Sequence, residues 1–313
     1  MKVLITLPFN NKHIQRFNEL PYEFIYINEK NMKFDIDLSE ISILMCYNPF
    51  NSIDISKMKN LKLIQLSSIG IDQVPINLLQ KNKVSLCNNN GGYKVPISEW
   101  IIWRILAHFK NEKNIIEKNA RSLWKIDMGL KELTNKNILF IGTGNIACET
   151  AIKLKAFNVN LIGLNRSGKK VSCFDEIATI SKLNDYKKIA DIIVLALPLT
   201  SETEGLLDEN FFSNLKPTAY FINISRGQIV NESDLLNALN NNLFAGCSLD
   251  VFKKEPLPSN HMFWDNDKIF ISPHNSWVSE FIQERRFDLF YENLVRFNSN
   301  LQLRNLINLN QGY

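Results

Sequence analysis

The sequence contains few of the features that mark secreted, membrane-spanning or metal-binding proteins. Its 313 residues include five cysteines, and none of them are spaced as a CxxC pair. This pattern favours separate, reduced thiols over a disulfide framework or a metal site. The longest apolar run, residues 192–199, is much shorter than the roughly 20 residues that span a bilayer. We therefore expect a cytoplasmic protein that uses no metal and has no membrane partner.

Long blocks of one charge are also missing. The chain has 36 Lys and Arg residues against 32 Asp and Glu residues, which is a net charge of +4 at pH 7. These charges are dispersed, whereas a nucleic-acid-binding arm concentrates basic residues in one block. We therefore expect no nucleic-acid partner. The N-terminal residues MKVLITLPFNN become polar too soon for a signal peptide and are expected to form a first strand.

Short apolar runs alternate with helix-like stretches from end to end of the chain. The runs are at residues 3–7, 24–27, 43–47, 61–66, 84–87, 137–142, 160–164, 191–197, 219–225, 243–252 and 268–272. They are largely continuous in their apolar character, which is typical of strands that helices cover on both faces. Alternation of such strands with helices predicts an α/β fold with parallel sheets.

Two long helical stretches separate these runs into groups. The first stretch, about residues 98–119, has Pro96 at its start, and Ser98 or the preceding loop could cap it. The second stretch covers about residues 279–298. At about 150 residues per domain, the length of the chain suggests two domains. We expect the two helices to make the crossings between them.

The expected architecture is a smaller domain interrupted by a larger one. Residues 96–281 would form a dinucleotide-binding domain with a Rossmann-type doubly wound parallel sheet. This domain would be inserted into a flavodoxin-like substrate domain that combines residues 1–95 with residues 282–313. The substrate domain would therefore be discontinuous in sequence.

A glycine-rich turn marks the expected dinucleotide site. Residues 142–147 read G-T-G-N-I-A, between an apolar strand and a helix over about residues 145–157. The first glycine of a G-x-G-x-x-A pattern permits the tight turn, and the second lets the backbone approach a pyrophosphate. The residues expected to bind the cofactor here are Gly142, Thr143, Gly144, Asn145 and Ile146. An ordinary strand–helix turn is the alternative on these letters alone.

The end of the next strand predicts which dinucleotide binds. An NAD site usually places an Asp or Glu there to hold the ribose hydroxyls, and such an acid would repel a 2′-phosphate. This chain instead has Asn165, Arg166 and Ser167, followed by Lys169 and Lys170. Arg166 could pair with a phosphate, and Ser167 could hydrogen-bond to it. We expect NADP(H) to be preferred and NAD(H) to be possible; the alternative is that Arg166 is a solvated loop residue.

Six further stretches carry a family resemblance together with the glycine turn. They are QLSSIGIDQVP at residue 65, NNGGYKVPISEW at 89, LPLTSETEGLL at 197, NISRGQIVNESDLLNAL at 223, LDVFKKEPLP at 249 and SPHNS at 272. In this order they resemble the D-isomer-specific 2-hydroxyacid dehydrogenase family, in particular NADP-preferring, glyoxylate/hydroxypyruvate reductase-like members. The resemblance implies an enzyme that transfers a hydride between NADP(H) and a small 2-keto acid or D-2-hydroxy acid.

The family pattern implies a catalytic Arg, Glu and His, which fall on Arg226, Glu255 and His274. An imidazole can donate and reaccept a proton near neutrality. A neighbouring carboxylate would favour the charged imidazole and orient its ring. The planar guanidinium of Arg226 can hold a substrate carboxylate and polarise a ketone. Taken singly, these residues could also be a strand-end arginine, a solvated turn carboxylate and a loop histidine.

The resemblance assigns further residues to the cofactor and the substrate. Asp250 matches the family's contact to the nicotinamide carboxamide. Other residues expected along the cofactor are Leu197, Pro198, Thr203, Ile224, Ser225, Arg226 and His274. Residues expected around the substrate are Ser68, Ile69 and Gly70 through their backbone N–H groups, Arg226, His274 and, for specificity, Trp277. Tyr47 and Phe50 could also face the substrate.

Two other functions stay open as alternatives. A non-catalytic NAD(P)-binding sensor or corepressor-like protein has the same fold, although it would not need all three catalytic residues. A phosphoglycerate dehydrogenase-like enzyme is the other, although the sequence shows no extra basic cluster for a substrate phosphate and no room for a regulatory domain before Tyr313. The resemblance also implies a homodimer in which Trp100, Trp103 and Trp124 would be buried.

Overall fold

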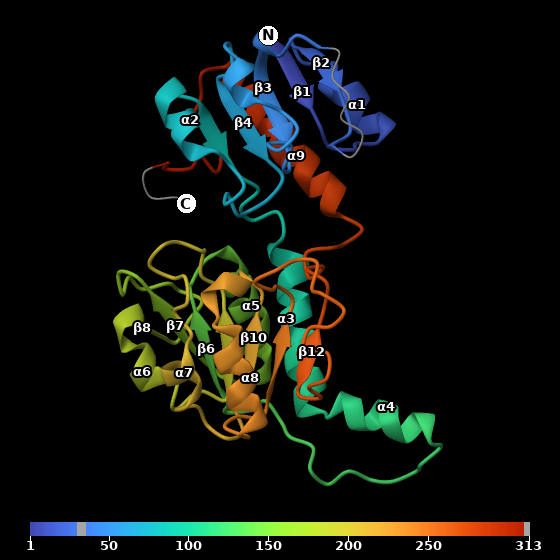
Figure 1. The fold of residues 1–313 in the computed structure, drawn as a ribbon, viewed down its shortest axis with the longest axis vertical. Coiled ribbons are helices and arrows are strands. Elements are labelled where there is room, and N and C mark those ends of the chain that lie inside the picture. Colours follow the sequence, from blue (N-terminus) through green and yellow to red (C-terminus); the bar gives the residue numbers. More distant parts are fainter. Residues whose placement is uncertain (30–35, 310–313) are drawn as a thin grey trace. The chain divides into compact units, whose positions relative to one another are not determined.

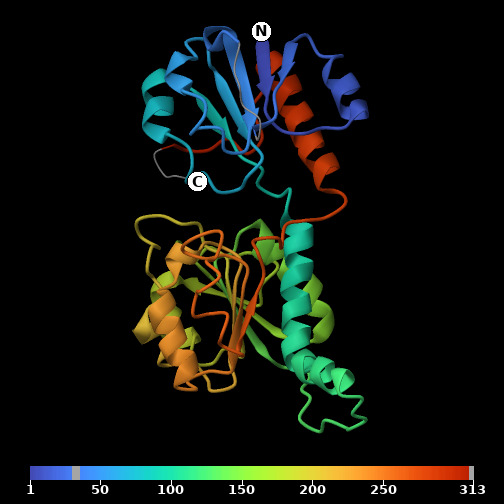
Figure 2. The ribbon, with the colours of Figure 1, turned by 45° about the vertical axis from the view of Figure 1, so that its right-hand side comes forward.

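The chain folds as two compact units, which the computed structural model describes over residues 1–29 and 36–309. The first unit combines Met1–Tyr93 with Ser279–Tyr313, and the second unit is Lys94–Val278. Each unit contains a parallel sheet with helices packed around it (Figures 1 and 2). The expected domain boundaries, after residues 95 and 281, differ from this division by two and three residues.

The sheet of the first unit has five parallel strands in the order β2-β1-β3-β4-β5. Its strands are β1 (Lys2–Ile5), β2 (Glu23–Tyr26), β3 (Ile41–Cys46), β4 (Leu63–Leu66) and β5 (Ser85–Cys87). Its helices are α1 (Asn11–Phe17), α2 (Ile76–Asn82) and α9 (Ile282–Asn298), with 3-10 turns η2 (Leu38–Glu40) and η3 (Ile55–Lys57). This strand order is the flavodoxin-like one, as expected.

Burial of the central strands explains why these apolar runs form a sheet between helices. Every residue of β3 and of β4 is buried. Phe17 of α1 and Phe287 and Phe290 of α9 fill the core on one face of the sheet. Leu79 of α2 belongs to the core on the other face. Because both faces are covered, a ligand could reach this sheet through the loops at the carboxyl ends of its strands.

The sheet of the second unit has seven parallel strands in the order β12-β11-β10-β9-β6-β7-β8. Its strands are β6 (Asn137–Ile141), β7 (Asn160–Asn165), β8 (Glu176–Thr179), β9 (Ile192–Leu195), β10 (Tyr220–Asn223), β11 (Gly246–Leu249) and β12 (Ile269–Ile271). The strand order reverses between β6 and β9, which is the topological switch point of a doubly wound Rossmann-type sheet. The predicted fold class, a Rossmann-type sheet beside a smaller flavodoxin-like one, is confirmed.

The helices of the second unit precede its first strand or lie between its strands in the chain. They are α3 (Lys94–Phe109), α4 (Glu112–Ala120), α5 (Asn145–Leu154), α6 (Leu183–Tyr186), α7 (Glu209–Phe212) and α8 (Glu232–Asn240), with 3-10 turns η4 (Lys155–Phe157), η5 (Ile180–Lys182) and η6 (Gly227–Ile229). Helix α3 packs beside α5. No helix in the described part of the chain has the length and the apolarity to cross a membrane.

Three details of the expected secondary structure are wrong. Strand β8 was missed because it is an edge strand whose residues are exposed or half-buried, so it needs no continuous apolar run. The first long helix is two helices, because Asn111 between α3 and α4 has a left-handed backbone with φ of 50°. Helix α3 also begins before Ser98, so this residue does not cap it; the Ser98 hydroxyl donates to the Val95 carbonyl instead.

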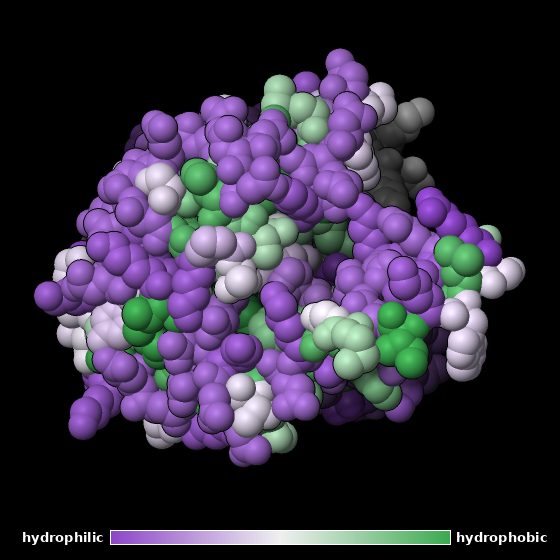
Figure 3. All heavy atoms as spheres, turned by 90° about the horizontal axis from the view of Figure 1, so that it is seen from below, coloured by the Kyte–Doolittle hydropathy of each residue, from purple (hydrophilic) through white to green (hydrophobic). Residues whose placement is uncertain are grey.

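An apolar surface lies on α4 and residues 121–130, a segment named here the arm. Its large apolar side chains with at least two-fifths of their surface exposed are Ile115, Ile116, Leu123, Trp124, Ile126, Met128 and Leu130. Figure 3 gives the view of Figure 1 from below and shows hydrophobic patches among a mainly hydrophilic surface. Of the two tryptophans on α3, Trp100 is buried and Trp103 is 44% exposed.

Candidate active site

The predicted cofactor and catalytic residues of the second unit gather at one edge of its sheet. Each follows or ends a different strand: Gly142 after β6, Asn165 at the end of β7, Leu197 after β9, Arg226 after β10, Asp250 after β11 and His274 after β12. All seven strands are parallel, so this is the carboxyl edge, where doubly wound folds bind their ligands. Glu255 joins this edge through its contact with His274.

The glycine turn has the shape that a pyrophosphate needs. Gly142 has φ of +106°, and a Cβ built there would lie 2.5 Å from the Ala196 carbonyl oxygen. Gly144 is the N-cap of α5, and a Cβ built there would have no heavy atom within 4 Å. No side chain caps this helix N-terminus, and Ala147 is fully buried. An open backbone surface at a helix N-terminus fits a bound phosphate group.

The turn after β7 presents hydroxyl and basic groups instead of a carboxylate. Asn165 ties this turn together, because its amide donates to the Thr143 hydroxyl at 3.2 Å and to the Lys169 carbonyl at 3.0 Å. The Ser167 hydroxyl accepts from the Lys169 N–H at 3.2 Å. Arg166 and Ser167 are exposed beside the glycine turn. Hydroxyl and basic groups of this kind are able to bind a phosphate.

The loops after β9 and β10 are joined by their own hydrogen bonds. The buried Ser225 hydroxyl donates to the Leu197 carbonyl, so these two expected cofactor residues are direct neighbours. The Thr203 hydroxyl donates to the Pro198 carbonyl at 2.7 Å. Ile224 is buried, whereas Pro198 is exposed. Thr203 thus holds the shape of this loop, in which Pro198 is exposed.

Arg226 is positioned by contacts of its backbone. The Asn223 side chain donates to the Arg226 carbonyl at 3.2 Å and accepts from the Ser225 N–H at 3.0 Å. Gly227 lies against the chain at Phe252, where a Cβ would be 1.9 Å from the carbonyl carbon. Only glycine permits this close approach of the Arg226 loop to the segment that carries Glu255.

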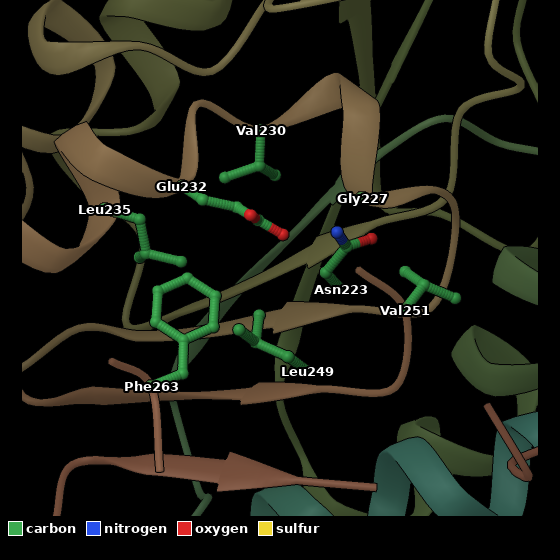
Figure 4. Close-up of a pocket in the computed structure, with 8 residues that line it drawn as sticks. All are labelled: Asn223, Gly227, Val230, Glu232, Leu235, Leu249, Val251 and Phe263. Carbon is green, nitrogen blue, oxygen red and sulfur yellow. The ribbon is translucent and has the colours of Figure 1, made fainter. Parts of the chain in front are cut away.

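The space behind this loop is too small to hold a cofactor. Gly227, Glu232 and Phe263 are among the residues that line a cavity of about 10 Å³, which is near the minimum for one water molecule (Figure 4). The Glu232 carboxylate accepts from the Lys253 N–H at 2.8 Å. This cavity is therefore a packing gap, and Glu232 fixes the segment leading to Glu255.

Glu255 and His274 form the central contact of the site. The Nδ1 atom of His274 lies 2.7 Å from Oε2 of Glu255, and the other carboxylate oxygen accepts from the Phe252 N–H at 2.9 Å. Partial burial acts to raise the pKa of the Glu255 carboxyl group, but these two hydrogen bonds act against it. The positive charges of His274 and Arg226 add to their effect, so the pKa of Glu255 lies below its ordinary value.

The backbone of His274 has an uncommon conformation that its neighbours maintain. Its φ is +49°, in the left-handed region that non-glycine residues rarely adopt. The indole N–H of Trp277 donates to the His274 carbonyl at 2.8 Å. Asp250 is almost fully buried, and its carboxylate accepts from the Ser272 hydroxyl at 2.6 Å and from the Ser276 N–H at 3.1 Å. Asp250 and Trp277 thus act on the His274 turn, which the sequence did not indicate.

The predicted substrate residues other than Arg226, His274 and Trp277 belong to the first unit. Ser68, Ile69 and Gly70 follow β4, and they are half-buried. Tyr47 follows β3 with its side chain exposed, whereas Phe50 packs against the core. These loops lie at the carboxyl edge of the first sheet, just as the cofactor residues do in the second.

The second unit matches a known protein family. A family model described as "D-isomer specific 2-hydroxyacid dehydrogenase, NAD binding domain" matches residues 102–276. This match covers more than half of the 313 residues and lies within the second unit. The chain belongs to the D-isomer specific 2-hydroxyacid dehydrogenase family. It is therefore an NAD(P)-dependent dehydrogenase, and its second unit is the dinucleotide-binding domain.

Three similar proteins illustrate the range of this family. A human glyoxylate reductase/hydroxypyruvate reductase is 32% identical over 223 residues, which cover 69% of the dehydrogenase and 67% of the human protein. A D-3-phosphoglycerate dehydrogenase of Archaeoglobus fulgidus is 26% identical over 99% of the dehydrogenase and 59% of that longer protein. An NADPH-dependent glyoxylate/hydroxypyruvate reductase of Sinorhizobium meliloti, solved with NADP and sulfate, has a TM-score of 0.85 at 25% identity, covering 100% and 99% of the two chains.

Proposed function

We propose that the dehydrogenase reduces a small 2-keto acid to a D-2-hydroxy acid, with His274 as the acid and NADPH as the preferred reductant. The observation that carries this proposal is the 2.7 Å contact between Glu255 and His274, with Arg226 close enough to influence the carboxylate. A sensor that only binds a dinucleotide has no need of this arrangement. It is the set of groups that carbonyl reduction requires.

We propose separate tasks for the two ring nitrogens of His274. Nδ1 is engaged by Glu255, so Nε2 is the nitrogen that holds the proton for the keto oxygen. Glu255 balances the positive charge of the protonated ring and orients it. The Arg226 guanidinium holds the substrate carboxylate. A nicotinamide held at this edge would supply the hydride for the carbonyl carbon, and His274 would donate the proton to the keto oxygen.

The preference for NADPH rests on the turn after β7. Arg166 and Ser167 are exposed there, and residues 165–170 contain no acid that would repel a 2′-phosphate. The Sinorhizobium meliloti reductase, whose whole fold is similar, was solved with NADP. NADH would be accepted less well, because its ribose hydroxyls would find no carboxylate at this position. The proposed contacts of the adenosine and pyrophosphate part of the cofactor are the turn after β7 and the backbone of Gly142–Ile146. The proposed contacts of its nicotinamide half are Leu197, Pro198, Thr203, Ile224, Ser225 and Asp250.

Small keto acids are the proposed substrates. The human and Sinorhizobium relatives are named for glyoxylate and hydroxypyruvate, which are both small 2-keto acids. The backbone N–H groups of Ser68, Ile69 and Gly70 are proposed contacts of the substrate carboxylate. Trp277 beside the His274 turn would limit the size of the substrate. A phosphorylated hydroxypyruvate is the second candidate, because the phosphoglycerate dehydrogenase relative matches 99% of this chain.

We also propose that the enzyme is a cytoplasmic homodimer that associates through the arm. All five cysteines are free, as a reducing compartment would keep them. The arm exposes many apolar side chains, and Trp124 is fully exposed. A segment with many exposed large apolar side chains often marks an interface. A second copy of the chain is the partner that the family resemblance favours.

The test of the proposed function is one substrate panel measured with both cofactors. Oxidation of NADPH and of NADH is followed with glyoxylate, hydroxypyruvate, pyruvate, phosphohydroxypyruvate and a bulky keto acid. We expect glyoxylate or hydroxypyruvate with NADPH to give the highest kcat/KM. The variant His274→Ala should lose at least about 100-fold in kcat, as expected for a missing general acid, while it still binds NADPH.

Three outcomes would each contradict one part of the proposal: the role of His274, the cofactor preference or the enzymatic activity itself. Normal turnover by His274→Ala would remove the histidine from the mechanism. A higher kcat/KM with NADH would reverse the cofactor preference alone. Dinucleotide binding without turnover on any keto acid would favour the sensor. The variant His261→Ala is the matched control, because His261 lies in the same unit and contacts Glu232 instead of Glu255.

A further inference from the structure

Three successive peptide groups after β4 have their carbonyl oxygens bound by the residues that follow β5. The pairs are Ser67 O with the Tyr93 hydroxyl, Ser68 O with the Asn89 N–H at 2.8 Å, and Ile69 O with the Asn88 side-chain amide at 2.7 Å. The next carbonyl, that of Gly70, accepts from the Ser68 hydroxyl at 2.8 Å. All of these residues belong to the first unit.

This pattern determines where the N–H groups of the same peptides point. In a trans peptide the C=O of one residue and the N–H of the next point in opposite directions. Binding of the Ser67, Ser68 and Ile69 carbonyls therefore turns the N–H groups of Ser68, Ile69 and Gly70 to the opposite side. None of these three N–H groups has an acceptor among residues 1–29 and 36–309. A run of such N–H groups is a binding site for an anion.

Asn88 is itself held rigidly, so it can act as a fixed donor. Its side chain is buried, and its carboxamide oxygen accepts from the Asn90 N–H at 3.1 Å. Its backbone carbonyl accepts from the Asn305 amide at 3.2 Å, and its N–H donates to the Asn305 carbonyl at 3.2 Å. The segment after α9 thus supports Asn88, which in turn supports Ile69.

We propose that Asn88 is a positioning residue for the substrate carboxylate. It does not touch the substrate; it holds the Ile69–Gly70 peptide so that the Gly70 N–H is presented to the anion. This inference rests on the proposed function, since it assumes that a keto acid binds the 68–70 loop. Without the Asn88 amide, the peptide could rotate and the Ile69 carbonyl oxygen could face the anion instead.

The test compares three variants in kinetics and in stability. Asn88→Ala removes the donor, and Asn88→Asp keeps the shape but places an acceptor where the donor was. Asn293→Ala is the matched control, because Asn293 is a buried amide of the same unit that bonds to Gln65 and Arg304 instead of the loop. Each variant is measured for kcat and KM with glyoxylate, inhibition by oxamate, NADPH binding and thermal unfolding.

Both Asn88 variants should raise the glyoxylate KM and the oxamate inhibition constant by about tenfold, the effect of losing one buried hydrogen-bond donor. Their kcat and their NADPH affinity should change little. Asn293→Ala should lower the melting temperature without changing KM. Equal KM values in the wild type and in Asn88→Asp would overturn the inference while leaving the proposed function intact. A wild type that reduces no keto acid would overturn both.

Discussion

Glu255 and His274 share one hydrogen bond, and two nearby residues of the segment after β11 position them. Glu255 is anchored through the Phe252 N–H, whereas the His274 turn is held by the buried carboxylate of Asp250. Because neither support includes the Glu255–His274 hydrogen bond itself, a change at either residue should alter the proton chemistry without unfolding the site. The lowered pKa of Glu255 keeps its carboxylate charged at neutral pH.

The variant Glu255→Gln tests this at the residue scale. The pKa of Glu255 is lowered in the folded protein. The favourable Glu255–His274 interaction is therefore complete above the ordinary pKa of a glutamate, and it is lost only as the pH falls through the lowered pKa of Glu255. The wild type should therefore keep its reductase activity down to about pH 5. Glutamine cannot balance the positive charge of a protonated His274 ring. The kcat/KM of the variant should therefore be about tenfold or more below that of the wild type at pH 7.5, and part of this loss should be recovered toward acidic pH.

The measurement is the pH dependence of kcat/KM for glyoxylate reduction in both proteins. The control is NADPH binding, which should be the same in the two. Superimposable pH profiles would show that Glu255 has no influence on the proton that is transferred.

At the scale of a structural element, the strand–turn–helix of the cofactor site contains two glycines with different reasons to be there. Gly142 has φ of +106° and lies against the backbone of Ala196, so it is needed for the fold. Gly144 has an ordinary φ of −75° and open space beside its Cα, so the fold does not require it. The space at Gly144 is instead what a pyrophosphate would occupy.

Two alanine variants distinguish the glycine that the fold requires from the glycine that the pyrophosphate requires. Gly142→Ala should lower the melting temperature or prevent folding, because its methyl group meets backbone and its φ becomes strained. Gly144→Ala should melt like the wild type but bind NADPH about tenfold more weakly or worse, since the methyl group blocks the phosphate. Thermal unfolding and a fluorescence titration with NADPH measure the two effects. Wild-type NADPH affinity in Gly144→Ala would argue against this turn as the pyrophosphate site.

At the scale of the whole molecule, the arm is an apolar surface that its own hydrogen bonds keep in shape. The Asp127 carboxylate accepts from the side chains of Asn111 and Asn114 at 3.0 and 2.7 Å, and from the Gly129 N–H at 2.9 Å. An ordered arm with exposed apolar residues loses little conformational entropy when it associates. The low entropy cost favours a permanent partner, such as a second copy of the chain, at the arm of each enzyme molecule.

The oligomeric state tests this directly. We expect the wild type to sediment as a dimer and the double variant Trp124→Glu, Ile126→Glu to sediment as a monomer, because two charges would have to be buried in each arm. Ile189→Glu is the control, since Ile189 is an exposed apolar residue of the same unit outside the arm. A monomeric wild type, or a variant that stays dimeric, would contradict the proposal.

The sequence by itself determined the fold class and the order of the site. Continuous apolar runs require strands covered on both faces, and the G-x-G-x-x-A turn is a local pattern in the letters. Arg226, Glu255 and His274 were implied by the family resemblance of the motifs around them. These features could be predicted because each depends on neighbours along the chain.

Only the tertiary structure decided which groups support the site. Asp250 reaches the His274 turn from another strand, and Asn88 joins β5 to the segment containing Asn305. The break at Asn111 and the edge strand β8 also left no clear periodic signal. Hydrogen bonds between residues so far apart in sequence follow from how strands and loops pack in three dimensions, and periodicity along the chain carries no information about such packing.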